Sequence, residues 1–106
     1  MKTLTKYENL HSHEFERKLK ENPNGILLDV RTVAEFQSER IPNAINMDIM
    51  DSSFREKIVA LDKTKSYFVY CRSGARSGQA CNIMSNEGLT PSNLAGGISN
   101  WQGQVE

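Results

Sequence analysis

One of the two cysteines stands where a hydrophobic stretch gives way to a glycine, two arginines and several hydroxyl groups. The segment runs from Tyr67 to Ala80 and reads YFVYCRSGARSGQA. A thiol becomes a strong nucleophile only when it loses its proton, and its pKa falls at helix N-termini and beside cationic side chains. Cys71 meets both conditions, because it ends a predicted strand and the residues after it lead into a predicted helix. We therefore expect Cys71 to be a catalytic nucleophile.

The residues after Cys71 are suited to hold negative charge. Unpaired amides of a loop that leads into a helix converge on one point and stabilise an anion there. Gly74 permits backbone conformations that are closed to other residues, and a helix starting near Arg76 adds the positive end of its dipole. Such a loop stabilises a thiolate, an extra sulfur on that thiolate, or an approaching anion. The expected substrate-binding residues are Arg72, Ser73, Gly74, Ala75, Arg76 and Ser77.

Each of these residues also has a purely structural interpretation. A lone cysteine after an apolar strand is usually a small buried hydrophobe, and arginines on a turn are often surface charges. The combination of flanking arginines, a hydroxyl-rich loop and a helix start favours catalysis over simple burial. Arg76 falls in the first helical turn, where a cation is disfavoured unless an anion lies near it.

The second cysteine and the histidines carry no predicted chemistry. Five helical residues separate Cys81 from Arg76, a rise of about 7 Å, whereas the Cα atoms of a disulfide lie about 4.4–6.8 Å apart. We therefore expect Cys81 to pack in the core without bonding to Cys71. His11 and His13 lie far from the cysteines in sequence, so no metal site is predicted.

The whole chain has the size and composition of one globular domain over residues 1–106. It is 38% hydrophobic and 25% charged, and thirteen basic residues balance thirteen acidic ones. This balance gives no global field for nucleic acid or an anionic membrane. No secretory signal follows Met1 and no segment has the roughly 18 apolar residues of a membrane span, so a cytoplasmic protein with free thiols is expected.

Short apolar strands alternate with helical patterns along the chain, which favours βαβ units and a central parallel sheet with helices on its faces. Strands are predicted around 4–7, 26–30, 45–47, 67–70 and near Leu94. Helices are predicted after Ser12 as N-cap, from Val33, from Phe54, from Ala75 or Arg76 to Gly88, and over 98–101. Two capping boxes are predicted, at Thr32 with Glu35 and at Ser53 with Glu56.

The order of four motifs resembles the rhodanese family of single-domain sulfurtransferases from Tyr7 to Trp101. The first is Leu28-Asp29-Val30-Arg31 with Glu35-Phe36, and the second is Ile41-Pro42-Asn43-Ala44-Ile45-Asn46. The third is the Cys71 loop, and the fourth is Leu94-Ala95-Gly96-Gly97-Ile98 with Trp101. Each motif alone is weak, whereas the four in this order are specific.

The resemblance implies an α/β rhodanese-like fold, with a five-stranded parallel sheet flanked by helices on both faces. It implies that Cys71 takes sulfane sulfur from thiosulfate as a persulfide and passes it to cyanide or a thiol, with no cofactor. The implied partners are a small anionic sulfur donor and a thiol, cyanide or protein sulfur acceptor. The sequence leaves open the physiological donor and acceptor and the oligomeric state.

The sequence departs from the family pattern at a few positions. Glu39 and Arg40 stand where the family often has Gly-His, and both lie away from the Cys71 loop in sequence. Asn43 replaces a common glycine, and asparagine tolerates positive φ, so the turn is expected to survive. Asp29, Arg31 and Glu35 are interpreted as residues that hold the fold.

Two rival functions stay open. Cysteine phosphatases and arsenate reductases resemble this loop but place an arginine six residues after the cysteine, where this chain has Ser77. The shorter spacing to Arg76 suits a cradle for one sulfur better than one for a phosphate. The other rival is a rhodanese-like binding module without turnover, although such modules often lack the cysteine that this chain retains.

Overall fold

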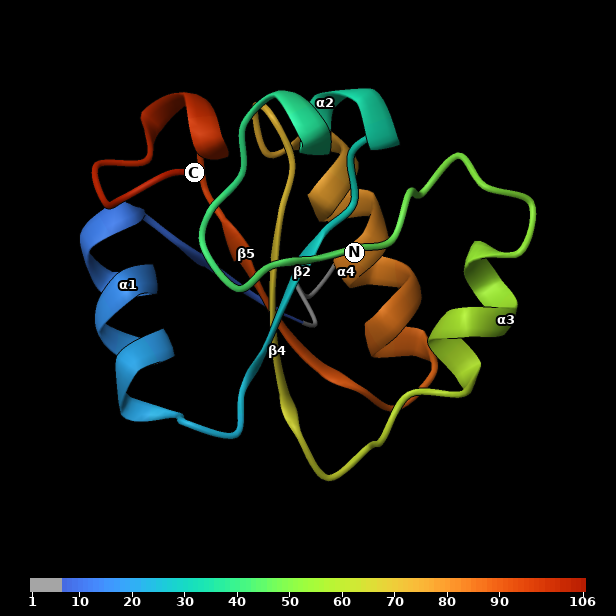
Figure 1. Cartoon of the computed structure of the whole chain (residues 1–106). Coiled ribbons are helices and arrows are strands. Elements are labelled where there is room, and N and C mark those ends of the chain that lie inside the picture. Colours follow the sequence, from blue (N-terminus) through green and yellow to red (C-terminus); the bar gives the residue numbers. More distant parts are fainter. Residues whose placement is uncertain (1–6) are drawn as a thin grey trace, which may run out of the picture.

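Five parallel strands form one sheet at the centre of the protein (Figure 1). The computed structural model describes residues 7–106. The strands are β1 (Glu8–Leu10), β2 (Ile26–Asp29), β3 (Ile45–Asn46), β4 (Ser66–Tyr70) and β5 (Thr90–Leu94). Their order across the sheet is β1-β5-β4-β2-β3, so β4 lies in the middle. The predicted five-stranded parallel α/β fold is confirmed.

Helices cover both faces of this sheet. They are α1 (Ser12–Glu21), α2 (Val33–Ser38), α3 (Phe54–Val59) and α4 (Ala75–Asn86), followed by the 3-10 turn η1 (Ile98–Asn100). Helices α3 and α4 pack on one face, while α1 and the C-terminal segment pack on the other (Figure 1). Within residues 7–106, no helix has the length and apolar character needed to cross a membrane.

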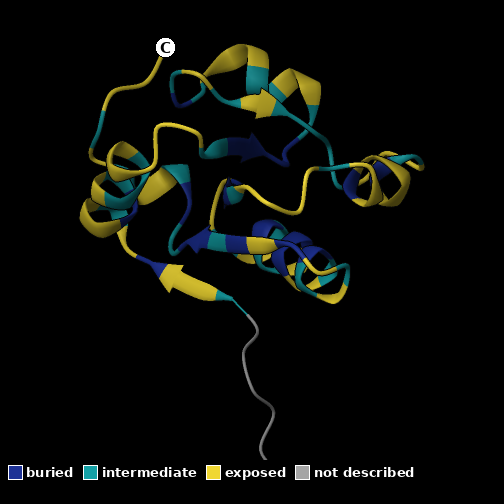
Figure 2. Ribbon diagram, turned by 90° about the horizontal axis from the view of Figure 1, so that it is seen from below, coloured by how far each residue is buried: buried dark blue, intermediate teal, exposed yellow. Residues whose placement is uncertain are grey.

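The central strand β4 sends its side chains alternately to the two faces. Tyr67 and Val69 join Cys71 in the core beneath α3 and α4, whereas Phe68 and Tyr70 enter the core beneath α1. All five residues are buried. In Figure 2, dark blue is concentrated in the middle of the molecule, and yellow lies mostly on its outer helices and loops. A strand that is buried on both faces has no polar side, which explains the unbroken apolar run in the sequence.

The helix starts test the predicted caps. The capping box at Thr32 is confirmed, since Glu35 N donates to the Thr32 hydroxyl and Thr32 N donates to the Glu35 carboxylate. The capping box at Ser53 is wrong, because the Ser53 hydroxyl instead donates to Asp51. The predicted N-cap at Ser12 is wrong: His11 is the N-cap of α1, and Ser12 is the first helical residue. The Ser12 hydroxyl accepts a hydrogen bond from Gln102 N and does not cap the helix.

The first and the last strand differ in their bounds from the prediction. Residues 4–6 of the predicted first strand lie outside the described residues, and β1 begins after Tyr7. The last strand was predicted near Leu94, yet β5 begins at Thr90 and contains Pro91. On the side of β1, no strand pairs with Pro91, because β1 pairs with β5 only over Ser92–Leu94; on the other side Pro91 lies in register with Tyr67 of β4. A proline with an unpaired side resembles one on an edge strand, where it is tolerated. The predicted helix stop at Gly88 is confirmed by its φ of 85°.

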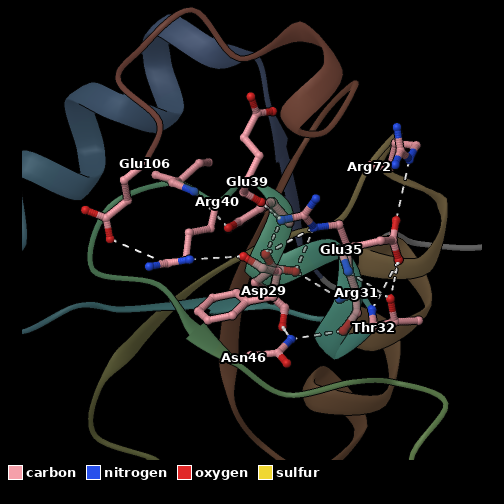
Figure 3. Close-up of polar contacts among 12 residues, drawn as sticks. Asp29, Arg31, Thr32, Glu35, Glu39, Arg40, Asn46, Arg72 and Glu106 are labelled. Carbon is pink, nitrogen blue, oxygen red and sulfur yellow. Dashed lines mark hydrogen bonds and ion pairs between the residues drawn. The ribbon is translucent and has the colours of Figure 1, made fainter.

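A buried ion pair holds the end of β2 (Figure 3). The side chains of Asp29 and Arg31 are 0% and 3% exposed, and Nη2 of Arg31 lies 2.6 Å from Oδ2 of Asp29. Arg31 Nη2 also donates to the carbonyl of Glu39, and Asn46 donates to the carbonyls of both Asp29 and Arg31. The pair therefore ties β2, α2 and β3 together, as the interpretation of Asp29 and Arg31 as structural residues requires.

Replacement of Asp29 by alanine should destabilise the fold strongly. The substitution leaves the Arg31 guanidinium buried without its carboxylate, which costs about 3–5 kcal/mol in comparable pairs. Urea denaturation followed by circular dichroism measures the loss. Glu21→Ala removes a carboxylate from an exposed pair with Arg17 and should change the free energy of unfolding by no more than about 0.5 kcal/mol. Equal losses in both variants would contradict this structural role.

Candidate active site

Three loops meet at one edge of the sheet because the carboxyl ends of parallel strands lie together. The registers place Asp29 beside Tyr70 and Val69 beside Asn93, so β2, β4 and β5 end close to one another. The residues after β4 form the Cys71 loop, which lies between the start of α2 and the loop after β5. The sheet therefore collects three of the four sequence motifs at one place.

The sulfur of Cys71 receives two hydrogen bonds from the residues that follow it. Gly74 N lies 3.1 Å from Sγ, and the hydroxyl of Ser77 lies 3.3 Å from it. The backbone amides of Ser73 and Ser77 also help to lower the pKa of the Cys71 thiol. These donors come from the last turn before α4 and from its first turn, where helical amides have no internal partner. The loop thus curls around the sulfur as the sequence predicts.

Two opposing effects act on the ionisation of Cys71. Burial raises the pKa of the Cys71 thiol, since the residue is only 1% exposed. Hydrogen bonds from Ser77, Gly74 and Ser73 stabilise the thiolate and outweigh burial, so the pKa lies below that of an ordinary cysteine. Cys71 packs against apolar neighbours on its strand side, but its sulfur faces a ring of donors.

The other predicted loop residues divide into two groups. Ser73, Gly74 and Ser77 act on the sulfur directly, and Gly74 adopts a φ of 102° to turn the chain into α4. Ala75 is the first residue of α4 and is exposed, without a hydrogen bond to the sulfur. Within residues 7–106, neither Arg72 nor Arg76 donates a hydrogen bond to Cys71, although the Arg76 charge acts on it through space.

Both arginines of the loop bind the same carboxylate. Arg76 makes two hydrogen bonds to Glu35, at 2.7 and 2.9 Å, and Arg72 Nε lies 3.4 Å from Glu35 Oε2 (Figure 3 shows the second contact). The hydrogen bonds from Arg76, and then those from Thr32, hold the pKa of Glu35 well below its usual range despite burial. Glu35 is therefore the anion that a cation in the first turn of α4 requires.

The loop after β5 supports the Cys71 loop from behind. Ile98 N donates to the carbonyl of Cys71 at 2.9 Å, and Ser99 N donates to the carbonyl of Arg72 at 3.1 Å. Gly97 adopts a φ of 63°, and a Cβ there would collide with the backbone of Arg72. A glycine is needed at this position for both reasons. The fourth motif thus holds the position of the third.

A small polar pocket opens beside Arg72. Its volume is about 260 Å³. Its lining residues are Arg31, Glu35, Ser38, Glu39, Arg72, Ile98 and Ser99. Glu39 is far from the Cys71 loop in sequence but near it in space, because Glu39 follows α2 and lines the same pocket as Arg72. The pocket offers an anionic or polar ligand both an exposed guanidinium and nearby carboxylates.

The second cysteine lies in the core, as the sequence predicts. Cys81 is fully buried in α4, and both cysteines are free thiols. Burial raises the pKa of Cys81 to about 12, which leaves it protonated and unreactive at neutral pH. Among the described residues, no group of three His, Cys, Asp or Glu side chains could hold a metal ion.

The sequence did not reveal the contact of Glu35 with the Cys71 loop. The sequence predicts only a fold-holding role for Glu35 and a substrate-binding role for Arg76. Only part of the signal is present in the chain. Both β2 and β4 are predicted as buried parallel strands, and helices that follow neighbouring parallel strands begin at the same edge, but the sequence does not give which strands are neighbours. Glu35 and Arg76 each stand in the first turn of such a helix.

Comparison with known proteins gives a consistent result. The family model described as "Rhodanese-like domain" matches residues 12–104. A putative sulfurtransferase of Bacillus subtilis is 33% identical over 91 residues, which cover 86% of each chain. The thiosulfate sulfurtransferase PspE of Escherichia coli is 37% identical over 71 residues, which cover 67% of this chain and 68% of PspE. The crystal structure of a rhodanese-related protein from Thermoplasma volcanium matches with a TM-score of 0.82 and 32% identity, over 94% of this chain and 98% of the other.

Removal of the Ser77 hydroxyl should raise the pKa of Cys71. Ser77→Ala deletes one donor to the sulfur, and a lost hydrogen bond of about 1 kcal/mol corresponds to a rise of somewhat less than one pKa unit. Because the reactive species is the thiolate, the rate of alkylation by iodoacetamide at neutral pH should fall, and the pH profile should move to higher pH.

The control is Cys81→Ala, which should leave this profile unchanged because Cys81 stays protonated. An unaltered midpoint in Ser77→Ala would show that the hydroxyl does not stabilise the thiolate.

Proposed function

The chain belongs to the rhodanese-like domain family, and on that premise we propose that it is a sulfurtransferase that carries sulfane sulfur as a persulfide of Cys71. The proposed donor is thiosulfate or a persulfide, and the proposed acceptor is cyanide, a small thiol or a protein thiol. The observation that carries this proposal is the set of donors around Sγ of Cys71, which stabilises a thiolate at the end of β4.

The first step loads the cysteine. The Cys71 thiolate attacks the outer sulfur of thiosulfate, a new S–S bond forms, and the S–S bond of thiosulfate breaks. Sulfite leaves with the bonding electron pair. The negative charge of the thiolate thus passes to the leaving group, and Arg72, the more exposed of the two loop arginines, is available to meet it.

The second step unloads the cysteine. The acceptor thiolate, or cyanide, attacks the outer sulfur of the persulfide, and the Cys71 thiolate leaves. The amides and hydroxyl that stabilise the resting thiolate also lower the energy of this leaving group. Donor and acceptor visit the same cysteine in turn, so the kinetics should be ping-pong. No residue outside the loop needs to transfer a proton when the acceptor arrives as a thiolate.

The rival functions fit the site less well. A phosphatase or arsenate reductase needs a guanidinium turned into the anion cradle, whereas the Arg76 guanidinium is held by both oxygens of Glu35. A binding module has no need of a thiol with a lowered pKa. The absence of turnover with every sulfur donor would favour that function. We place the activity in the cytoplasm, where two free thiols remain reduced.

Mass spectrometry of the intact protein after incubation with thiosulfate tests the proposal. The parent protein and Cys81→Ser should each gain the mass of one sulfur atom, because both keep the activated thiol. Cys71→Ser should gain nothing. Subsequent addition of cyanide should remove the extra mass and release thiocyanate.

A persulfide located on Cys81, or faster hydrolysis of an aryl phosphate than turnover of thiosulfate, would contradict the assignment. Cys81 serves as the matched control because it is the second thiol of the chain and lies buried in the same core.

A further inference from the structure

Glu35 neutralises the two cations that flank the predicted nucleophile. Its carboxylate accepts from Arg76 through both oxygens and also lies 3.4 Å from Arg72. The three charged groups come from two helices or their leading loops, 37 to 41 residues apart in the chain. Nothing in the capping role of Glu35 requires either arginine, because Thr32 alone completes that cap.

The carboxylate holds the two arginines differently. The Arg76 side chain is 30% exposed and binds in a two-pronged arrangement, which is the geometry that fixes a guanidinium most firmly. Arg72 is 65% exposed and makes one longer contact, at the edge of the polar pocket. Exposed single contacts of this kind contribute little free energy and exchange readily. Arg72 can therefore leave Glu35, whereas Arg76 stays.

We propose that Glu35 is a positioning residue that sets the charge specificity of the site: it fixes Arg76 in place and competes with an anionic donor for Arg72. The inference rests on the proposed sulfurtransferase function and specifies which donors it favours. With Cys71 ionised, the thiolate and Glu35 balance the two loop arginines, so an anion approaching the pocket meets no net positive charge. The incoming anion is attracted only if Arg72 leaves Glu35 and pairs with that anion instead.

The neighbouring charged groups do not alter this balance in favour of anions. Arg31 lines the same pocket, but its charge is already paired with the buried Asp29. Glu39 lines the pocket as well and adds negative charge, and the negative charge of Asp48 also acts on Arg76. The site should therefore discriminate against doubly charged donors such as thiosulfate relative to donors with one charge or none, such as small persulfides.

Glu35→Gln isolates the charge from the fold. A glutamine at this position still accepts from the backbone at Thr32, because glutamine serves as well as glutamate in a capping box. Glu39→Gln is the matched control: it removes the same charge from the same pocket, and within residues 7–106 the Glu39 side chain makes no ion pair with either arginine. Circular dichroism and thermal unfolding show whether each variant keeps the fold.

The decisive measurement compares alkylation of Cys71 by iodoacetate, an anion, and by iodoacetamide, a neutral molecule of similar size. Both reagents need the same thiolate and the same access, so the ratio of their rates reports the local charge alone. Glu35→Gln should raise this ratio about three- to tenfold, since it removes the negative charge that pairs with both loop arginines. Glu39→Gln should raise it by less than about twofold. Peptide mapping confirms that the adduct is on Cys71.

A second pair of variants tests the role of Arg72. Arg72→Gln alone should lower the ratio about threefold, and this arm does not depend on the cap of α2. In the Arg72→Gln background, Glu35→Gln should lose most of its effect, since the released cation is gone. If Glu35→Gln still raises the ratio in the Arg72→Gln background, the effect belongs to Arg76 and the proposal is overturned. An unchanged ratio in Glu35→Gln alone would also overturn it.

The sulfur-transfer readout separates this inference from the proposed function. In Glu35→Gln, KM for thiosulfate should fall severalfold with a smaller change in kcat, because the variant binds the dianion better. If Cys71 takes up no sulfur from any donor while the alkylation ratio still responds, the sulfurtransferase function fails and the charge control by Glu35 stands. If sulfur transfer proceeds and neither the alkylation ratio nor KM changes in Glu35→Gln, the sulfurtransferase function stands and the charge control by Glu35 fails.

Discussion

The parallel pairing of β2, β4 and β5 is the constraint on which the site depends. These strands end at the same edge of the sheet, so the segments that follow them must share one small volume. Each segment supplies something that the others lack: α2 brings a carboxylate, the Cys71 loop brings the thiol and its donors, and the loop after β5 fixes the backbone behind them. The buried pair of Asp29 and Arg31 keeps the first of these segments in place.

The chemistry of Cys71 results from two opposing effects: burial raises the pKa of the thiol, and hydrogen bonds to the sulfur lower it. A thiol enclosed among Val69, Met84 and other apolar side chains should stay protonated, as the neighbouring Cys81 does. The two cysteines differ in their position relative to α4. Cys81 lies within the helix, where amides are already paired, whereas Cys71 precedes the helix and faces amides without helical partners. Two thiols of one core thus have opposite reactivity.

The sequence predicted the fold closely and the site in part. Apolar runs at β2 and β4, the cap at Thr32 and the stop at Gly88 depend on local preferences, and such signals can be read from the chain. The start of β5 was missed because Pro91 argues against a strand unless the pairing partner is known to be short. The partner of Arg76 was missed for a similar reason. A contact across 41 residues depends on which strands are neighbours, and no local pattern records that.

The alternation of side chains along β4 also limits how this protein can vary. Tyr67, Val69 and Cys71 face α4 because they occupy every second position of one pleated strand. Deletion or insertion of one residue in that strand would rotate the sulfur through half a turn, toward Phe15 and Trp101 on the opposite side of the sheet. The spacing from the middle of β4 to the thiol must therefore be kept if the sulfur is to face the donors at the start of α4.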